Sequence, residues 1–153
     1  YWGAAPPGCG GITGSLRTGC CGTDPVVPYD AACTPPDEPP DDAEIQGLTR
    51  SGKARLNDAC NAQLSLESRF DLAYNAAHAL CLAALRRKGY RAANRYIVFQ
   101  ALPHTLGLGP EVWRVLDKCH NTRNLGEYEG LLDVDEKLVE SLIEAAQAVE
   151  QAL

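Results

Sequence analysis

The chain has 153 residues, of which 45% are hydrophobic and 22% are charged, and a formal net charge of −6 at pH 7. This length suits one domain with an extension. No apolar run approaches the roughly 20 residues that a membrane-spanning helix needs, so we expect no membrane association. Tyr1 stands where an initiator Met would be, so we expect a trimmed chain or a fragment, which leaves room for an upstream targeting segment.

Residues 1–42 differ in composition from the rest of the chain. They hold eight of the ten prolines and half of the glycines. Few large apolar residues are present to offset the entropy of ordering this backbone. We expect a flexible or irregular, acidic extension, and the alternative is a coat that packs on the remainder. We expect no metal site, because the spacing of a zinc knuckle is missing from its cysteines, Cys9, Cys20, Cys21 and Cys33.

From residue 43 onward, apolar residues recur at the three- and four-residue steps of helices. A first helix is expected to reach about Cys60. The second is the clearest, since Ser65 can cap it and Gly89 can end it. Free cysteines are expected in the core at Cys60, Cys81 and Cys119. The odd total of 7 cysteines cannot pair completely and favours a reducing, cytoplasmic setting.

Three further helices are expected. The third covers about 92–102 and is ended by Pro103, with a loop over 104–109. The fourth starts at Pro110. The fifth starts with a capping box of Asp133 and Glu136. We find no strand pairs and no repeat, and short loops favour antiparallel neighbours. The predicted fold is therefore all-α, an antiparallel bundle of four or five helices over residues 43–153.

The fourth helix changes from apolar to polar along one face. At about 100° per residue, Leu116 and Cys119 belong to an apolar stripe. His120, Arg123 and Glu127 continue this stripe, all within about 40° of Leu116. A glycine at position 126 would destabilise a helix interior by about 1 kcal/mol relative to alanine. Two alternatives therefore stay open: the helix continues through Gly126, or it ends there.

Two interpretations of this stripe stay open. In the first, Arg123 is buried and held by Glu127 or a carbonyl for structure alone, because a guanidinium removed from water needs partners. In the second, the stripe emerges into a cleft or an oligomer interface. There Arg123 would bind a phosphate as a fork, His120 would move a proton near neutral pH, and Asn124 would orient the phosphate.

Residues 86–123 form a locally basic segment, with eight bases against two acids. Such a segment binds phosphate or is a solvated face. Arg91 and Arg95 are the candidates here for phosphate binding. His78 and His104 are expected to be ordinary histidines with satisfied hydrogen bonds.

Two stretches, "SRFDLAYNAAHALCLAALRRKGYR" and "VLDKCHNTRNLGEYEG", resemble HEPN proteins of prokaryotes. These are small helical bundles, often encoded beside minimal nucleotidyltransferases or within toxin–antitoxin and defence loci. Arg123, Asn124 and Tyr128 match the branch of the family written R-N-x-x-x-Y, whose members act as partners or binding modules. In the family's ribonucleases, two protomers join motifs in which a histidine follows the arginine, whereas here His120 precedes Arg123.

The resemblance implies a homodimer, and three hypotheses for the function follow in order of preference. The first is a non-catalytic module that binds a nucleotide, RNA or a nucleotidyltransferase, through Arg91, Arg95 and the residues Arg123, Asn124, Glu127 and Tyr128. The second is a metal-independent ribonuclease toxin with His120 and Arg123 as catalytic residues. The third is an oligomeric scaffold whose polar stripe only fixes helix register. None of the three requires a cofactor or a metal.

Overall fold

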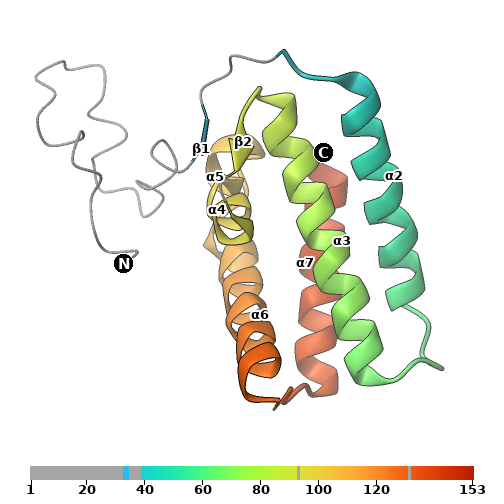
Figure 1. The fold of residues 1–153 in the computed structure, drawn as a ribbon. Coiled ribbons are helices and arrows are strands. Elements are labelled where there is room, and N and C mark those ends of the chain that lie inside the picture. Colours follow the sequence, from blue (N-terminus) through green and yellow to red (C-terminus); the bar gives the residue numbers. More distant parts are fainter. Residues whose placement is uncertain (1–32, 35–38, 93, 131) are drawn as a thin grey trace, which may run out of the picture.

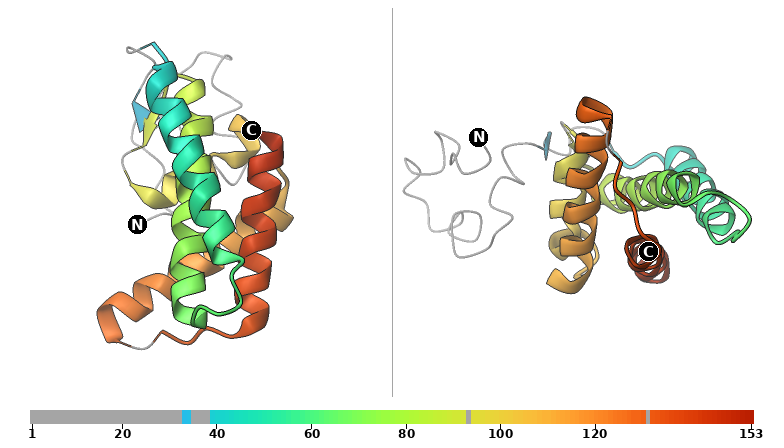
Figure 2. Two further views of the ribbon diagram at one scale, coloured as in Figure 1. Left: turned by 90° about the vertical axis from the view of Figure 1, so that its right-hand side faces the viewer. Right: turned by 90° about the horizontal axis from the view of Figure 1, so that it is seen from below.

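A computed structural model describes residues 33–34, 39–92, 94–130 and 132–153. Three long helices, α2 (Asp42–Ala59), α3 (Leu66–Arg87) and α7 (Glu136–Ala152), lie side by side (Figure 1). A fourth, α6 (Pro110–Glu129), crosses this layer at an incline, as Figure 2 shows. The prediction of an all-α bundle is confirmed. Most of the predicted extension at residues 1–42 lies outside the described residues, including Cys9, Cys20 and Cys21.

The first two helices begin where their sequence signals stand. The side chain of Asp41 caps α2 and accepts a hydrogen bond from the backbone N–H of Ala43 at 2.9 Å. Ser65 caps α3 as predicted, through its hydroxyl oxygen 3.2 Å from the N–H of Ser68. Gly89 follows α3 with a φ of 84°, a conformation that glycine adopts without steric cost. The predicted boundaries of the second helix are therefore confirmed.

The predicted third helix is wrong in its boundaries. Residues 91–92 form a strand, β2 (Arg91–Ala92), which pairs antiparallel with β1 (Cys33–Thr34). The helix α4 (Arg95–Gln100) starts only after Asn94, whose side chain accepts from the N–H of Ile97. A second short helix, α5 (Leu102–Thr105), follows directly, with Pro103 in its first turn instead of ending a helix. Proline is tolerated there because the first-turn N–H has no helical partner.

The α6 helix begins at Pro110, as predicted, and continues through Gly126 to Gly130, which ends it with a φ of 69°. Gly126 is explained by a close approach, since an added Cβ would lie 2.8 Å from Cδ1 of Leu132. The capping box predicted at Asp133 is wrong. Asp135 caps α7 instead, through Oδ1 at 2.7 Å from the N–H of Leu138.

The core is built around α3, which contributes the largest share of buried residues. Small residues let the helices approach closely, and Gly52 of α2 lies directly against Leu80. Cys81 and Cys119 are buried, as expected, but Cys60 is exposed at the end of α2. The core position predicted for Cys60 is wrong because α2 ends one residue before it. No helix in the described ranges is both long and apolar enough to cross a bilayer.

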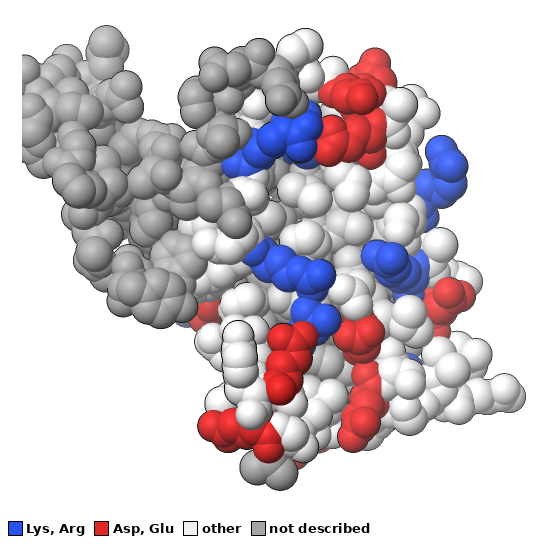
Figure 3. Space-filling view, viewed as in Figure 1, with Lys and Arg blue, Asp and Glu red and all other residues white. Residues whose placement is uncertain are grey.

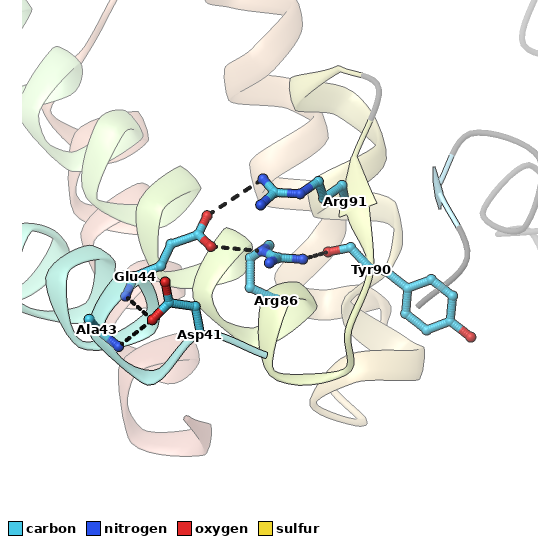
Figure 4. A network of polar contacts seen from close by, with 6 residues as sticks. All are labelled: Asp41, Ala43, Glu44, Arg86, Tyr90 and Arg91. Atoms are coloured by element: carbon cyan, nitrogen blue, oxygen red, sulfur yellow. Dashed lines mark hydrogen bonds and ion pairs between the residues drawn. The ribbon is translucent and has the colours of Figure 1, made fainter. Parts of the chain in front are cut away.

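Two buried arginines join the helices through ion pairs. Arg86 is 2% exposed, and its Nε lies 3.2 Å from Oε2 of Glu44 on α2. Arg86 also donates to the carbonyl oxygen of Tyr90, and Arg91 of β2 lies on the other oxygen of Glu44 (Figure 4). At the other end of α3, Arg69 donates to Glu136 at 2.8 Å. Burial of a guanidinium is tolerated because these partners satisfy it.

Candidate functional site

The inner face of α6 runs from the core to the surface. Leu116 and Cys119 are buried, and His120 is half-buried. The Arg123 side chain is 23% exposed and that of Glu127 is 55% exposed. The polar half of the predicted stripe therefore begins beneath the surface and ends in solvent, with Arg123 at the boundary.

Both ring nitrogens of His120 have a hydrogen-bond partner. Its Nδ1 lies 2.8 Å from the hydroxyl of Tyr74 on α3, and its Nε2 lies 3.1 Å from the amide Nδ2 of Asn124. The Tyr96 ring of α4 stacks on the imidazole, with centroids 5.3 Å apart and planes inclined by 7°. These contacts fix the orientation of His120 from three helices.

The hydrogen bonds of His120 are those of a neutral imidazole. An amide nitrogen only donates, so Nε2 accepts from Asn124, and Nδ1 carries the proton and donates to Tyr74. Burial lowers the pKa of His120, Asp117 acts against this shift, and Arg123 and Arg95 lower the pKa further, with a smaller opposing effect from Glu127. Burial also raises the pKa of Tyr74, against the influence of Arg123 and Arg95. Both side chains are therefore neutral near pH 7.

Arg123 is held by an aromatic face and by two carboxylates at the rim. Its guanidinium carbon lies 4.8 Å from the Tyr74 ring centroid, a distance typical of a cation–π interaction. Its Nε is 3.7 Å from Oδ1 of Asp71, and its Nη2 is 3.4 Å from Oε1 of Glu127. These ion pairs are longer than charge-assisted hydrogen bonds. The guanidinium is thus positioned by the Tyr74 ring and only loosely neutralised.

His78 is a part of this site that the sequence did not single out. Its ring contacts Phe99 edge-on, with centroids 6.1 Å apart, and Phe99 also contacts His120 at 6.3 Å. Burial lowers the pKa of His78 to about 4, and Arg95, Arg123 and His120 contribute in the same direction. We call the following residues the polar cluster: Tyr74, His78, Arg95, Tyr96, Phe99, His120, Arg123 and Asn124.

Other predicted site residues lie elsewhere. Arg91 pairs with Glu44 at the far end of α3, in the network of Figure 4. Tyr128 is 87% exposed at the end of α6, outside the half-buried environment of the polar cluster. Glu127 remains at its rim through the contact with Arg123. The structure therefore brings together His120, Arg123 and Asn124, with the exposed Arg95 acting electrostatically on His120, and it separates Arg91 and Tyr128 from them.

The basic segment does not form one continuous patch. Acids from other parts of the chain pair with several of its arginines, and Figure 3 shows basic and acidic side chains interspersed on one face. Beside Arg123 lies a shallow cavity of about 220 Å³. It is lined by Phe70, Asp71, Arg123, Gly126, Glu127 and Leu132. Arg123 is thus a predicted phosphate-binding cation that lines a cavity on the surface.

Sequence patterns gave partial signals for the missed residues. Tyr74 and His78 are four apart on α3 and therefore share a face, but their partners on α4 and α6 are distant in sequence. Comparison of the chain with models of known families, with curated proteins and with solved structures found no match. Within the described residues, no group of three or more His, Cys, Asp or Glu side chains is arranged to hold a metal ion.

Proposed function

We propose that the chain is a HEPN-like module that binds a phosphate group of a nucleotide or of RNA at the polar cluster. Arg123 and Arg95 supply the positive charge. Asn124, next to Arg123 on α6, supplies an amide beside the phosphate. The proposal includes a cytoplasmic setting, a homodimer, and a nucleotidyltransferase partner in a toxin–antitoxin or defence system. These additions rest on the resemblance of the two quoted stretches to HEPN proteins.

The observation that carries the proposal is the environment of Arg123. Its guanidinium is largely removed from water and oriented by the Tyr74 ring, yet its carboxylate partners are 3.4 and 3.7 Å away and more than half exposed. A phosphate can displace such partners at little cost, because exposed ion pairs contribute at most about 1 kcal/mol. A preorganised guanidinium binds phosphate as a planar fork.

The geometry supports binding more than RNA cleavage. A general acid or base must reach the proton that it transfers. Both ring nitrogens of His120 are within hydrogen-bond distance of protein side chains, Tyr74 and Asn124. We therefore assign His120 the role of positioning Asn124 and Tyr74 around Arg123. The ribonuclease hypothesis requires the bond between His120 and Asn124 to open when RNA binds.

The experiment measures binding of ATP and of a short single-stranded RNA by calorimetry at several salt concentrations. We expect wild-type binding to weaken as salt rises, because phosphate contacts release counterions. Arg123→Ala should abolish binding, and Arg123→Lys should weaken it because lysine lacks the fork. Arg114→Ala is the matched control, since Arg114 lies on the same helix beside Trp113 and should bind like wild type.

Two outcomes would contradict the proposal. One is the absence of ATP and RNA binding by the folded wild type, with no co-purifying protein partner. The other is equal loss of affinity in Arg123→Ala and Arg114→Ala, which would indicate nonspecific attraction. RNA breakdown in EDTA by wild type and not by His120→Ala would replace binding alone by the ribonuclease hypothesis.

A further inference from the structure

Two imidazoles and the guanidinium of Arg123 lie in one half-buried site, and the exposed Arg95 lies at the start of α4 beside it. His78 and His120 contact the same Phe99 ring, at 6.1 and 6.3 Å between centroids. Arg95 and Arg123 act electrostatically on both histidines. His78, His120 and Arg123 thus contact Tyr74 or Phe99, two aromatic rings that carry no compensating negative charge.

The acids that face this site lie at its edge. On α6 they are Asp117, which is half-exposed, and Glu127, and on α3 the acid is Asp71. Asp71 and Glu127 are already placed on Arg123. On α4, the charged group that faces the histidines is Arg95. Without an added anion, a proton on His78 would meet burial and two guanidiniums with no carboxylate acting on it. A proton on His120 would meet burial and the same guanidiniums, and Asp117 would be its main support.

We infer that His78 and His120 take up a proton when an anion binds at Arg95 and Arg123, so that the site binds multiply charged anions more tightly as the pH falls. This inference rests on the proposed function, because it concerns the same site. It adds His78 as a second histidine of that site and makes proton uptake part of ligand binding.

The physical cause is the sign of the electrostatic interaction. A bound dianion neutralises the guanidiniums, and their repulsion of an imidazolium becomes an attraction to the ligand. Linkage requires the converse, that protonation strengthens anion binding. The amide of Asn124 can turn its oxygen toward Nε2 when that nitrogen gains a proton, because the amide carries both a donor and an acceptor.

The test uses sulfate, which keeps its charge across the pH range and cannot itself supply the proton. Calorimetric titrations at about pH 5.5, in two buffers of different ionisation enthalpy, give the number of protons taken up per sulfate. We expect net proton uptake. The affinity for sulfate should rise as the pH falls, by up to about tenfold per pH unit for each proton taken up. The double variant His78→Gln/His120→Gln should bind sulfate more weakly, because His120 positions Asn124 and Tyr74, and the sulfate that it still binds should bring no proton uptake. The control His104→Gln removes an exposed histidine of α5 and should retain uptake.

A measurement on the wild type keeps the inference testable if the double variant does not fold. The chain has 3 histidines, so their ring resonances can be followed by NMR against pH. With sulfate, two of the three should titrate at higher pH than without it. Sulfate binding with no proton uptake and no such change would overturn the inference and leave the proposed function standing. Failure of sulfate, ATP and RNA to bind at any pH would overturn both.

Discussion

The hydroxyl of Tyr74 lies 2.8 Å from Nδ1 of His120, and this contact joins α3 to α6 where the inner face of α6 turns polar. The Tyr74 ring also lies beneath the guanidinium of Arg123 at 4.8 Å. One tyrosine therefore positions both the histidine and the arginine of the candidate site. Its two ends act differently, the ring through the cation–π contact and the hydroxyl through the hydrogen bond.

Tyr74→Phe separates these two contributions. The ring beneath Arg123 remains, but the partner of Nδ1 is removed, so we expect a loss of about 1 kcal/mol of stability. Chemical denaturation would measure it. Tyr128→Phe is the control, since that side chain is 87% exposed and should change nothing measurable. Equal stability of Tyr74→Phe and wild type would mean that the hydroxyl contact contributes nothing to folding.

Acid should destabilise the protein through His78. Its pKa is lowered from 6.5 to about 4 in the folded chain, so the unfolded chain binds a proton that the folded chain does not. Stability from this group is present above about pH 6.5 and is lost as the pH falls toward about 4, by at most about 3 kcal/mol. Denaturation curves across that range should show a smaller decline for His78→Gln than for wild type. Parallel curves for the two proteins would exclude this role.

Two glycines of α2 should respond oppositely to alanine. A Cβ on Gly52 would lie 2.7 Å from Cγ of Leu80, whereas a Cβ on Gly47 would have nothing within 4 Å. Gly52→Ala should cost about 1 to 2 kcal/mol through overpacking. Gly47→Ala should gain up to about 1 kcal/mol through helix propensity. Thermal unfolding of both variants is the measurement, and a Gly52→Ala protein as stable as Gly47→Ala would mean that α2 and α3 are not packed this closely.

The ion pairs of Glu44 and Glu127 should differ in their contributions to stability. Glu44 faces Arg86, which is 2% exposed, so Glu44→Ala leaves a buried charge without its carboxylate. We expect a loss of about 2 kcal/mol, below the range for fully buried pairs because water reaches Glu44. Glu127→Ala should cost less than about 0.5 kcal/mol because its partner Arg123 is closer to solvent. Adding Arg86→Met to Glu44→Ala should restore stability, and a further loss would contradict this explanation.

The sequence predicted much of the fold because its signals are local. Ser65, Gly89 and Pro110 mark helix ends through bonds to nearby residues, and the structure confirms all three. The strand at residues 91–92 was missed because its partner lies at residues 33–34, far away in the sequence. Asp135 was missed as a cap because several acids near it fit the same pattern, and only the path of the chain selects one.

The candidate site was predictable only where it lies on one helix. The angular pattern of α6 placed His120 beside Arg123 on one face, and their shared neighbour Tyr74 confirms this geometry. The partners from α3 and α4 depend on how three helices cross, which periodicity does not specify. Arg91 was predicted to bind phosphate because of its charge alone. The structure pairs it with Glu44 of α2, a contact between segments distant in sequence that periodicity does not predict.

The exposed end of α6 has a consequence for local opening. Beyond Arg123, Leu125 is 53% exposed and Tyr128 is 87% exposed, and the helix stops at the left-handed Gly130. Such a segment, with little apolar burial, opens at a lower free energy than the core. Amide hydrogens over residues 124–129 should therefore exchange with solvent sooner than those of α3. A ligand bound to Arg123 would slow this exchange, because it would stabilise the turn of α6 around Arg123, from which the exposed segment continues.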